Sequence, residues 1–224
     1  MVMVDPKGIG AHIRMRIPLL TPLEQRVLDR VMARASLSDQ TSIKEVASEN
    51  EVSEAMLVKL AKKLDFAGFR ELRGALVRYR EASPALSDEI SPDDDMERLV
   101  GKVFDNAISS LEETKAILDM AVLKRAVDLL AGAGHLLLYG VGGSAVIAED
   151  LAHKLLRIGI ASQVFSDSHL MLMSASLCND SCVVLAISHS GRTSDVCDAA
   201  ALARRHGARL IVLTSYALSP LAQQ

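Results

Sequence analysis

The stretch LLLYGVGGSA, residues 136–145, decides the fold class of the second half of the chain. An apolar run that ends in the pattern G-x-G-x-x-A, at Gly140, Gly142 and Ala145, is typical of a buried strand that turns directly into a helix. Glycines at such a turn let the backbone approach an anion at the helix N-terminus, where free N–H groups point at the ligand. Taken alone, the pattern allows either a dinucleotide or a smaller anion.

Three further apolar runs follow at 161–165, 182–188 and 209–215, and they alternate with helical stretches at 144–158, 168–178 and 192–205. This alternation predicts βαβ units around a parallel sheet of four strands. Polar and apolar residues do not alternate along these runs, which are almost entirely apolar, as expected for strands that are covered on both faces. The C-terminal half is therefore predicted to be a three-layer α/β domain.

Hydroxyl side chains follow the third of these strands, in the sequence SHSGRT (188–193). Ligands of such sheets bind beyond the carboxyl ends of the strands, so we expect this turn and Ser144 to face one site. Hydroxyls and amides suit a phosphate, whereas an adenosine needs an apolar slot. The dinucleotide alternative needs an acid about 20 residues beyond the glycines. Asp167 fills that place only at a longer spacing, and the alternative stays open on the turn alone.

The sequence pattern of the first 82 residues predicts helices throughout. TPLEQRVLDRVMARA begins with Thr21 as N-cap and Glu24 three residues later, which is a capping box. The next two helices are expected to begin after Ser42 and Ser53, and only about three residues separate them. Two short helices joined by so tight a turn form a helix-turn-helix. Glu51 occupies the turn position that often carries glycine, so we expect it at positive φ, and the small or apolar residues expected to be buried where the helices cross are Val46, Ala47, Val52, Leu57 and Leu60.

The stretch SPALSDEISPDDD, residues 83–95, interrupts the helical pattern with two prolines and several acids. We interpret it as a linker between a helix-turn-helix domain over 1–82 and a second domain over 96–224. Residues 96–131 return to helical periodicity and are expected to lead into the α/β domain.

Composition excludes some classes of protein. Residues 1–82 carry 14 Lys and Arg against 11 Asp and Glu, a net charge of +3 that is compatible with DNA binding but does not decide it. Cys178, Cys182 and Cys197 show no paired spacing, so we expect buried thiols and neither a disulfide framework nor a metal site. The sequence shows no membrane span and no signal peptide, which predicts a cytoplasmic protein without a membrane partner.

Two segments together resemble a known family. YGVGGSAVIAEDLAHKLLRIG (139–159) and VVLAISHSGRTSDV (183–196) resemble a sugar isomerase (SIS) domain, which has a flavodoxin-like sheet. LTPLEQRVLDRV (20–31) and SIKEVASENEVSEAMLVKLAKKLDFAGFRELRGAL (42–76) resemble the N-terminal domain of the RpiR family of bacterial transcriptional regulators. The resemblance covers residue 20 to the C-terminus. It also implies that the chain ends before the last strand and helix of an SIS domain.

The resemblance implies a regulator of carbohydrate metabolism that binds an operator in double-stranded DNA, senses a phosphorylated sugar without any cofactor, and forms a dimer or tetramer through its SIS domains. Its ligand-binding residues would be Gly142, Gly143, Ser144, His169, Ser188, Ser190, Gly191 and Thr193. Its DNA-binding residues would be Ser42, Ser53, Glu54, Met56, Lys59, Lys62 and Lys63. Family members usually carry Thr, Arg and Gly where this chain has Met56, Lys59 and Asp65, which bears on the operator that it reads.

The alternative function is a sugar-phosphate aldose–ketose isomerase. That chemistry needs a base and an acid with tuned pKa values, and the candidates are Glu149, His153, His169 and His189. No pair among them has a spacing that favours catalysis, and we therefore expect a sensor and not an enzyme.

Overall fold

The computed structural model describes residues 5–34, 36–82 and 90–224. The chain forms two compact units, Met1–Leu118 and Asp119–Gln224. Residues 83–89 of the expected linker lie outside the described residues. The division after Leu118 places residues 96–118 with the first unit, whereas the sequence assigned them to the second domain.

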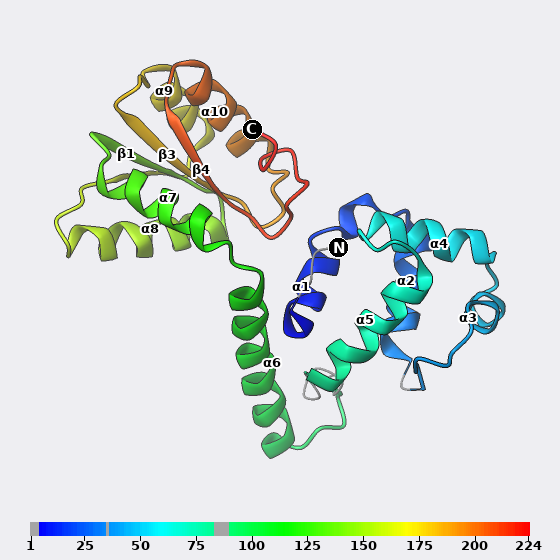
Figure 1. Cartoon of the computed structure of the whole chain (residues 1–224). Coiled ribbons are helices and arrows are strands. Elements are labelled where there is room, and N and C mark those ends of the chain that lie inside the picture. Colours follow the sequence, from blue (N-terminus) through cyan, green and yellow to red (C-terminus); the bar gives the residue numbers. More distant parts are fainter. Residues whose placement is uncertain (1–4, 35, 83–89) are drawn as a thin grey trace. The chain divides into compact units, whose positions relative to one another are not determined.

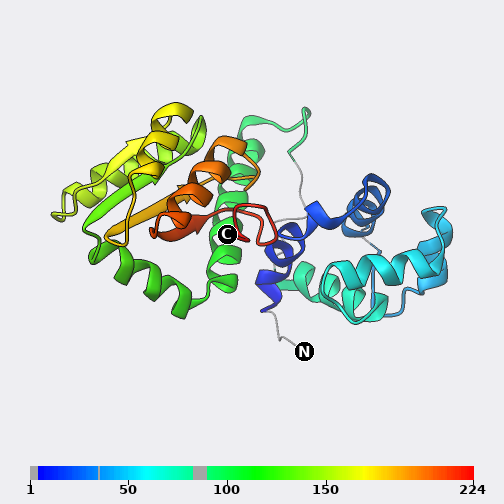
Figure 2. The same ribbon diagram turned by 90° about the horizontal axis from the view of Figure 1, so that it is seen from above.

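The first unit is entirely helical in the part of the chain that the structure describes (Figures 1 and 2). Its elements are η1 (Pro6–Gly8), α1 (Ile9–Arg14), η2 (Ile17–Leu19), α2 (Pro22–Ala33), α3 (Ile43–Glu49), α4 (Glu54–Lys63), α5 (Phe69–Ala82) and α6 (Met96–Ile117). One apolar core joins α1 to α5, and the helix-turn-helix positions Val46, Ala47, Leu57 and Leu60 are buried in it. Val52, which was also expected to be buried, is half-buried against this core, because it lies in the turn between the two helices.

The predicted helix starts are confirmed. Thr21 and Glu24 form a complete capping box on α2, because each side chain bonds the backbone N–H of the other. Ser42 accepts a hydrogen bond from the backbone N–H of Glu45 at 3.1 Å, and Ser53 accepts one from Met56 at 3.2 Å. Such caps stabilise a helix by about 1 kcal/mol each, which fixes where α3 and α4 begin.

Helix α6 packs on η1 and α1 through polar side chains. Glu113 is 2% exposed, accepts a hydrogen bond from the hydroxyl of Tyr79 and forms an ion pair with Arg14. Lys7 adds an ion pair with Glu112 at 2.9 Å. Because a helix normally packs through its apolar face, sequence periodicity did not reveal that α6 belongs to the first unit.

The second unit is a parallel sheet of strand order β2-β1-β3-β4. Its elements are α7 (Met120–Ala131), β1 (His135–Tyr139), α8 (Gly143–Leu156), β2 (Gln163–Phe165), α9 (Ser168–Ser176), β3 (Cys182–Ile187), α10 (Ser194–Arg205) and β4 (Arg209–Leu213). All three strand pairs are parallel, as predicted.

Helices cover both faces of this sheet, which gives the predicted three layers (Figure 1). Leu136, Leu138 and Val183 face α7 and α8, while the alternate residues Tyr139 and Val184 face α9 and α10. The strands are buried on both sides and therefore consist almost entirely of apolar residues.

The residues after β4 return to the start of α10 (Figures 1 and 2). The backbone N–H of Leu221 donates to the carbonyl of Gly191 at 3.0 Å, and the side chain of Gln224 donates to the carbonyl of Cys197 at 2.9 Å. This segment therefore supports the turn between β3 and α10.

Among the described helices, none has both the length and the apolar character that a bilayer crossing requires.

Candidate functional site

The turn between α3 and α4 has the geometry of a helix-turn-helix. Glu51 lies at φ 55°, so the positive φ predicted for this residue is confirmed. The backbone N–H of Val52 donates to the carbonyl of Ala47 at 3.0 Å, and Asn50 donates from its side chain to the carbonyl of Val46 at 2.9 Å. These bonds close the turn without glycine at a cost of roughly 1–2 kcal/mol for the backbone of Glu51.

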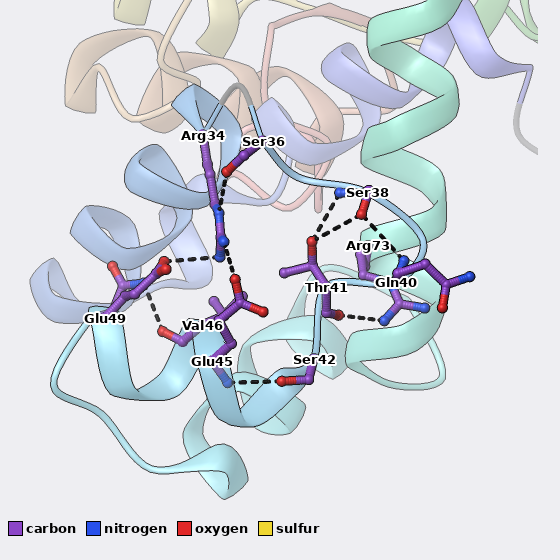
Figure 3. Close-up of polar contacts among 11 residues, drawn as sticks. Arg34, Ser36, Ser38, Gln40, Thr41, Ser42, Glu45, Val46, Glu49 and Arg73 are labelled. Atoms are coloured by element: carbon purple, nitrogen blue, oxygen red, sulfur yellow. Dashed lines mark hydrogen bonds and ion pairs between the residues drawn. The ribbon is translucent and has the colours of Figure 1, made fainter.

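Arg34, just after α2, holds α3 in place (Figure 3). Its guanidinium forms ion pairs with Glu45 and with Glu49 (2.9 Å), and its Nε donates to Ser36 at 3.0 Å. The hydrogen bond from Arg34 holds the pKa of Glu45 below its usual range. This contact could not be predicted from the sequence, because Arg34 follows α2 whereas Glu45 and Glu49 lie on α3.

Arg73 of α5 supports the start of α3 from the other side (Figure 3). Its guanidinium donates to the backbone carbonyl of Thr41 at 2.5 Å. Thr41 is buried, and its hydroxyl accepts from the backbone N–H of Ser38 at 3.0 Å. The segment that enters α3 is therefore fixed to the helical core.

The three lysines of α4 do not have the same environment. Lys59 and Lys62 are exposed on the outer surface of the helix. Lys63 instead donates to Glu24 at 2.6 Å, and Glu24 is 4% exposed. Burial opposes ionisation of Glu24, but the hydrogen bonds from Lys63 and Thr21 outweigh it and hold the pKa of Glu24 below its ordinary value. Lys63 therefore has a structural partner, which leaves Lys59 and Lys62 as the lysines of α4 that are available to a ligand.

The other residues of this region that were predicted to bind DNA also differ in their surroundings. Ser42 and Ser53 are helix caps, Glu54 is exposed in the first turn of α4, and Met56 is half-buried against the core. Asp65 lies two residues beyond the end of α4, has φ 70° and forms an ion pair with Arg16 at 3.0 Å. A positive φ at this residue explains why glycine suits the position, and an aspartate tolerates that conformation better than most residues do.

Two helices of the second unit begin at the same edge of the sheet. Strands β1 and β3 are hydrogen-bonded neighbours, and α8 and α10 follow their carboxyl ends. This edge, between β1 and β3, is where the strand order reverses, and it is the expected ligand site of a doubly wound sheet.

Neither α8 nor α10 has a side-chain cap, and the short α1 of the first unit also lacks one, whereas α2, α3, α4, α6, α7 and α9 each have one. Gly142 precedes α8 and has no side chain to offer. Thr193 precedes α10, but its hydroxyl lies 3.1 Å from that of Ser188 instead of bonding the first turn. The N–H groups that begin these two helices are therefore not bonded by their own N-cap side chains, which suits an anion.

Ser188 is the centre of the second turn. It is 2% exposed, and its hydroxyl accepts a hydrogen bond from the backbone N–H of Gly191 at 3.1 Å. Ser190 accepts from the backbone N–H of Arg192 at 3.2 Å. Ser188, Ser190, Gly191 and Thr193 thus form one compact loop between β3 and α10, while half-buried Ser144 lies in the first turn of α8.

The glycines of the two turns differ in their surroundings. Gly142 has φ 59° and faces open space, and Gly143 begins α8 with open space as well. Gly191 has φ 61°, and a Cβ placed there would lie 2.1 Å from the hydroxyl oxygen of Ser219. Gly191 is therefore required both by its backbone conformation and by close packing.

The residues proposed for dinucleotide binding or for catalysis either have other partners or are exposed. Asp167 caps α9 by accepting from the backbone N–H of Leu170 at 3.0 Å, which argues against a ribose-binding role. His169 is exposed in the first turn of α9, and no described contact joins it to Ser144 or Ser188. His189 lies 2.9 Å from the hydroxyl of Ser215 and edge-on to Tyr216.

A separate cavity of about 400 Å³ lies beside α9 and is lined mainly by apolar side chains such as Leu137, Phe165 and Met173. Two of the three cysteines also line it. Burial and the neighbouring Cys182 raise the pKa of Cys178 to about 11, so this thiol stays protonated at neutral pH. The prediction of buried thiols is confirmed for Cys178 and Cys182, while Cys197 is half-buried. No group of residues able to hold a metal ion occurs in the part of the chain that the structure describes.

A helix-turn-helix followed by a parallel α/β unit with a polar edge at its strand-order reversal defines a class of protein, the ligand-responsive DNA-binding regulators. Comparison with known proteins supports this class and gives the family. The family model described as "Helix-turn-helix domain, rpiR family" matches residues 7–83, and the family model described as "SIS domain" matches residues 129–224. The chain belongs to the RpiR family of transcriptional regulators.

Curated relatives extend over nearly the whole chain. The HTH-type transcriptional regulator RpiR of Escherichia coli K12 is 40% identical over 221 residues, which is 97% of this chain and 75% of that protein. The regulator HexR of the same organism is 32% identical over 213 residues, with 95% and 73% covered.

Solved protein structures are also similar to this chain. The Vibrio vulnificus NanR protein, complexed with ManNAc-6P, has a TM-score of 0.54 at 27% identity and covers 95% of this chain and 76% of its own. The sugar isomerase domain of an RpiR transcription factor from Sphaerobacter thermophilus has the same TM-score at 26% identity, with 56% and 71% covered.

Proposed function

We propose that this regulator binds an operator in double-stranded DNA through α4 and binds a phosphorylated sugar at the edge between β1 and β3. The observation that carries the proposal is the pair of helix starts without side-chain caps, beside a loop of serine and threonine hydroxyls, in a chain that also has a helix-turn-helix. Such a protein works in the cytoplasm, where its DNA is.

The DNA interface that we propose is the exposed side of α4. Lys59 and Lys62 offer two ammonium groups to phosphates, and Glu54 and Ser53 lie at the helix start, which in this motif approaches the bases. Arg34 and Arg73 fix α3, the first helix of the motif, in place. Helix α4 would therefore have a fixed support when it enters a groove of the DNA. Lysines bind phosphate as point charges without the fixed fork of arginine, so these two are expected to contribute affinity more than base selectivity.

The ligand site that we propose combines two anion-binding helix starts. The N–H groups of α8 and α10 carry partial positive charge, which favours a phosphate. Ser144, Ser190 and Thr193 supply hydroxyls for the phosphate and for the neighbouring sugar, and buried Ser188 holds the loop in shape. The structural relative NanR binds ManNAc-6P, a phosphorylated sugar, and this supports the same class of ligand here.

The isomerase alternative has no specific support. Glu149, His153 and His169 are exposed, and the relatives that match nearly the whole chain are regulators. A regulator of this kind reads DNA as a dimer with fixed half-site spacing. We propose that the second unit and the helices that lead into it supply that dimer, and that bound sugar phosphate changes how the two heads are held.

Two experiments test the two halves of this proposal. Gel-shift titration against the DNA upstream of its own gene should show a specific complex, and the absence of any complex up to micromolar protein would refute the DNA half. A thermal-shift screen across phosphorylated sugars and the corresponding free sugars should raise the melting temperature with a phosphorylated member only. Ser176→Ala, which changes an exposed hydroxyl of α9, is the matched control and should leave that shift intact.

A further inference from the structure

The side of α4 that points away from the core of the first unit carries two apolar residues among its charged ones. The buried side of this helix is formed by Leu57, Leu60 and Ala61. At 3.6 residues per turn, Ala55 lies roughly 170° and Val58 roughly 110° around the helix from the centre of that buried side. Ala55 is exposed and Val58 is half-buried. Both residues therefore belong to the outward side, and Ala55 lies at its centre.

Ala55 and Val58 also lie in the N-terminal half of the helix. Ser53 caps α4, so Ala55 is the second residue of the helix and Val58 the fifth. In a helix-turn-helix, the N-terminal residues of the second helix contact base edges in the major groove. In the DNA complex proposed above, these two apolar side chains therefore lie where the base sequence is read.

The composition of α4 restricts how it can recognise a base. Its sequence EAMLVKLAKK (54–63) contains no Arg, Asn or Gln, whose planar groups form paired hydrogen bonds with guanine or adenine. An apolar side chain finds one apolar partner on the base edges of the major groove, the C5 methyl group of thymine. Ala55 and Val58 are three residues apart, so their Cβ atoms are neighbours on the helix surface, about 5–6 Å from each other. They are close enough to contact the methyl groups of two adjacent thymines.

We propose that Ala55 and Val58 are specificity-determining residues that bind the C5 methyl groups of two adjacent thymines in the operator. The inference rests on the proposed function, because it needs α4 in the major groove, and it deepens that function by naming the chemical group that is read. Lys59 and Lys62 keep the role described above, since contacts to phosphates position the protein but do not distinguish bases.

Deoxyuridine provides the first test, because uracil differs from thymine only in lacking the C5 methyl group. The DNA upstream of the gene is prepared with thymidine or with deoxyuridine throughout, and the dissociation constant of the full chain is measured on both by fluorescence anisotropy at one salt concentration. Burial of a methyl group changes affinity about fourfold, so the loss of two contacts should raise the dissociation constant at least about tenfold. Equal affinity for the two DNAs would overturn the proposal.

Variants assign the effect to the two residues, because uracil also alters the shape of DNA. Ala55→Gly with Val58→Ala should weaken binding to thymine DNA and reduce the ratio of the two dissociation constants to less than about threefold. Lys62→Ala should weaken binding to both DNAs equally and keep the wild-type ratio. Ala33→Gly changes an exposed alanine of α2 and should alter neither the affinity nor the ratio. A double change that leaves the ratio at its wild-type value would overturn the assignment to Ala55 and Val58.

Single uracils, placed one at a time within the footprint of the protein, locate the contacts. The wild-type chain should lose about fourfold in affinity at two adjacent thymines, and a loss spread evenly over the thymines would overturn the proposal. This measurement does not depend on whether the variants fold. A chain that binds no DNA would overturn the proposed function and this inference with it. A chain that binds thymine and uracil DNA equally would overturn only the inference.

Discussion

Three glycine substitutions at the two turns of the proposed ligand site give a graded test of the structure. Gly143→Ala changes a helical residue in open space, and it should stabilise the second unit by about 0.5–1 kcal/mol because alanine loses less entropy in a helix. Gly142→Ala puts a side chain at φ 59° in open space, so backbone strain alone should cost about 1–3 kcal/mol.

Gly191→Ala adds a steric term to the same strain. The new Cβ would lie 2.1 Å from Oγ of Ser219 and 2.8 Å from Oγ1 of Thr214. Overpacking of this kind costs about 1–3 kcal/mol, so the total should reach about 2–6 kcal/mol. Urea unfolding of the three variants, followed by circular dichroism, measures the series. Equal losses for Gly142→Ala and Gly191→Ala would refute the packing described for the loop before α10.

Three further predictions concern individual side chains. Lys59→Ala with Lys62→Ala should weaken binding to all DNA sequences and reduce the slope of log K against log salt by about 2, as measured by fluorescence anisotropy; an unchanged slope would exclude phosphate contacts. Lys63→Ala should cost about 1–3 kcal/mol of stability at pH 7, because it leaves the buried carboxylate of Glu24 without its ammonium partner. The pKa of Glu24 is lowered by folding, so this difference is full above the ordinary carboxyl pKa of about 4.3 and disappears as the pH falls through the folded value; urea titrations at pH 7 and pH 3 measure it, and a pH-independent difference would contradict the pair. Ser188→Ala should lower the affinity for a sugar phosphate about tenfold by calorimetry, since it removes the hydroxyl that fixes Gly191 and Thr193, and unchanged affinity would place the ligand elsewhere.

Local features of the fold followed from the sequence because they depend on neighbouring residues. The capping box of Thr21 and Glu24, the positive φ of Glu51 and the four parallel strands are each encoded within a few positions. The two turns of the proposed ligand site could be predicted for the same reason, since glycines and hydroxyls directly follow apolar strands.

Contacts between distant segments did not follow from the sequence. Lys63 shows the periodicity of an exposed lysine, but its partner Glu24 lies 39 residues away. Arg34 and Arg73 hold α3 through ion pairs and a carbonyl that no local pattern predicts. The polar packing of α6 is the clearest case, because amphipathic periodicity predicts burial of the opposite side.

The central claim is that one chain joins DNA binding by α4 to sugar-phosphate binding at the edge between β1 and β3. The most direct measurement is a fluorescence anisotropy titration of the full chain on the DNA upstream of its own gene, repeated with each of a set of phosphorylated sugars and their free counterparts. At least one phosphorylated sugar should shift the DNA dissociation constant by at least about fivefold, its free counterpart should not, and Ser188→Ala should reduce the shift. A DNA affinity that no phosphorylated sugar changes would contradict the account.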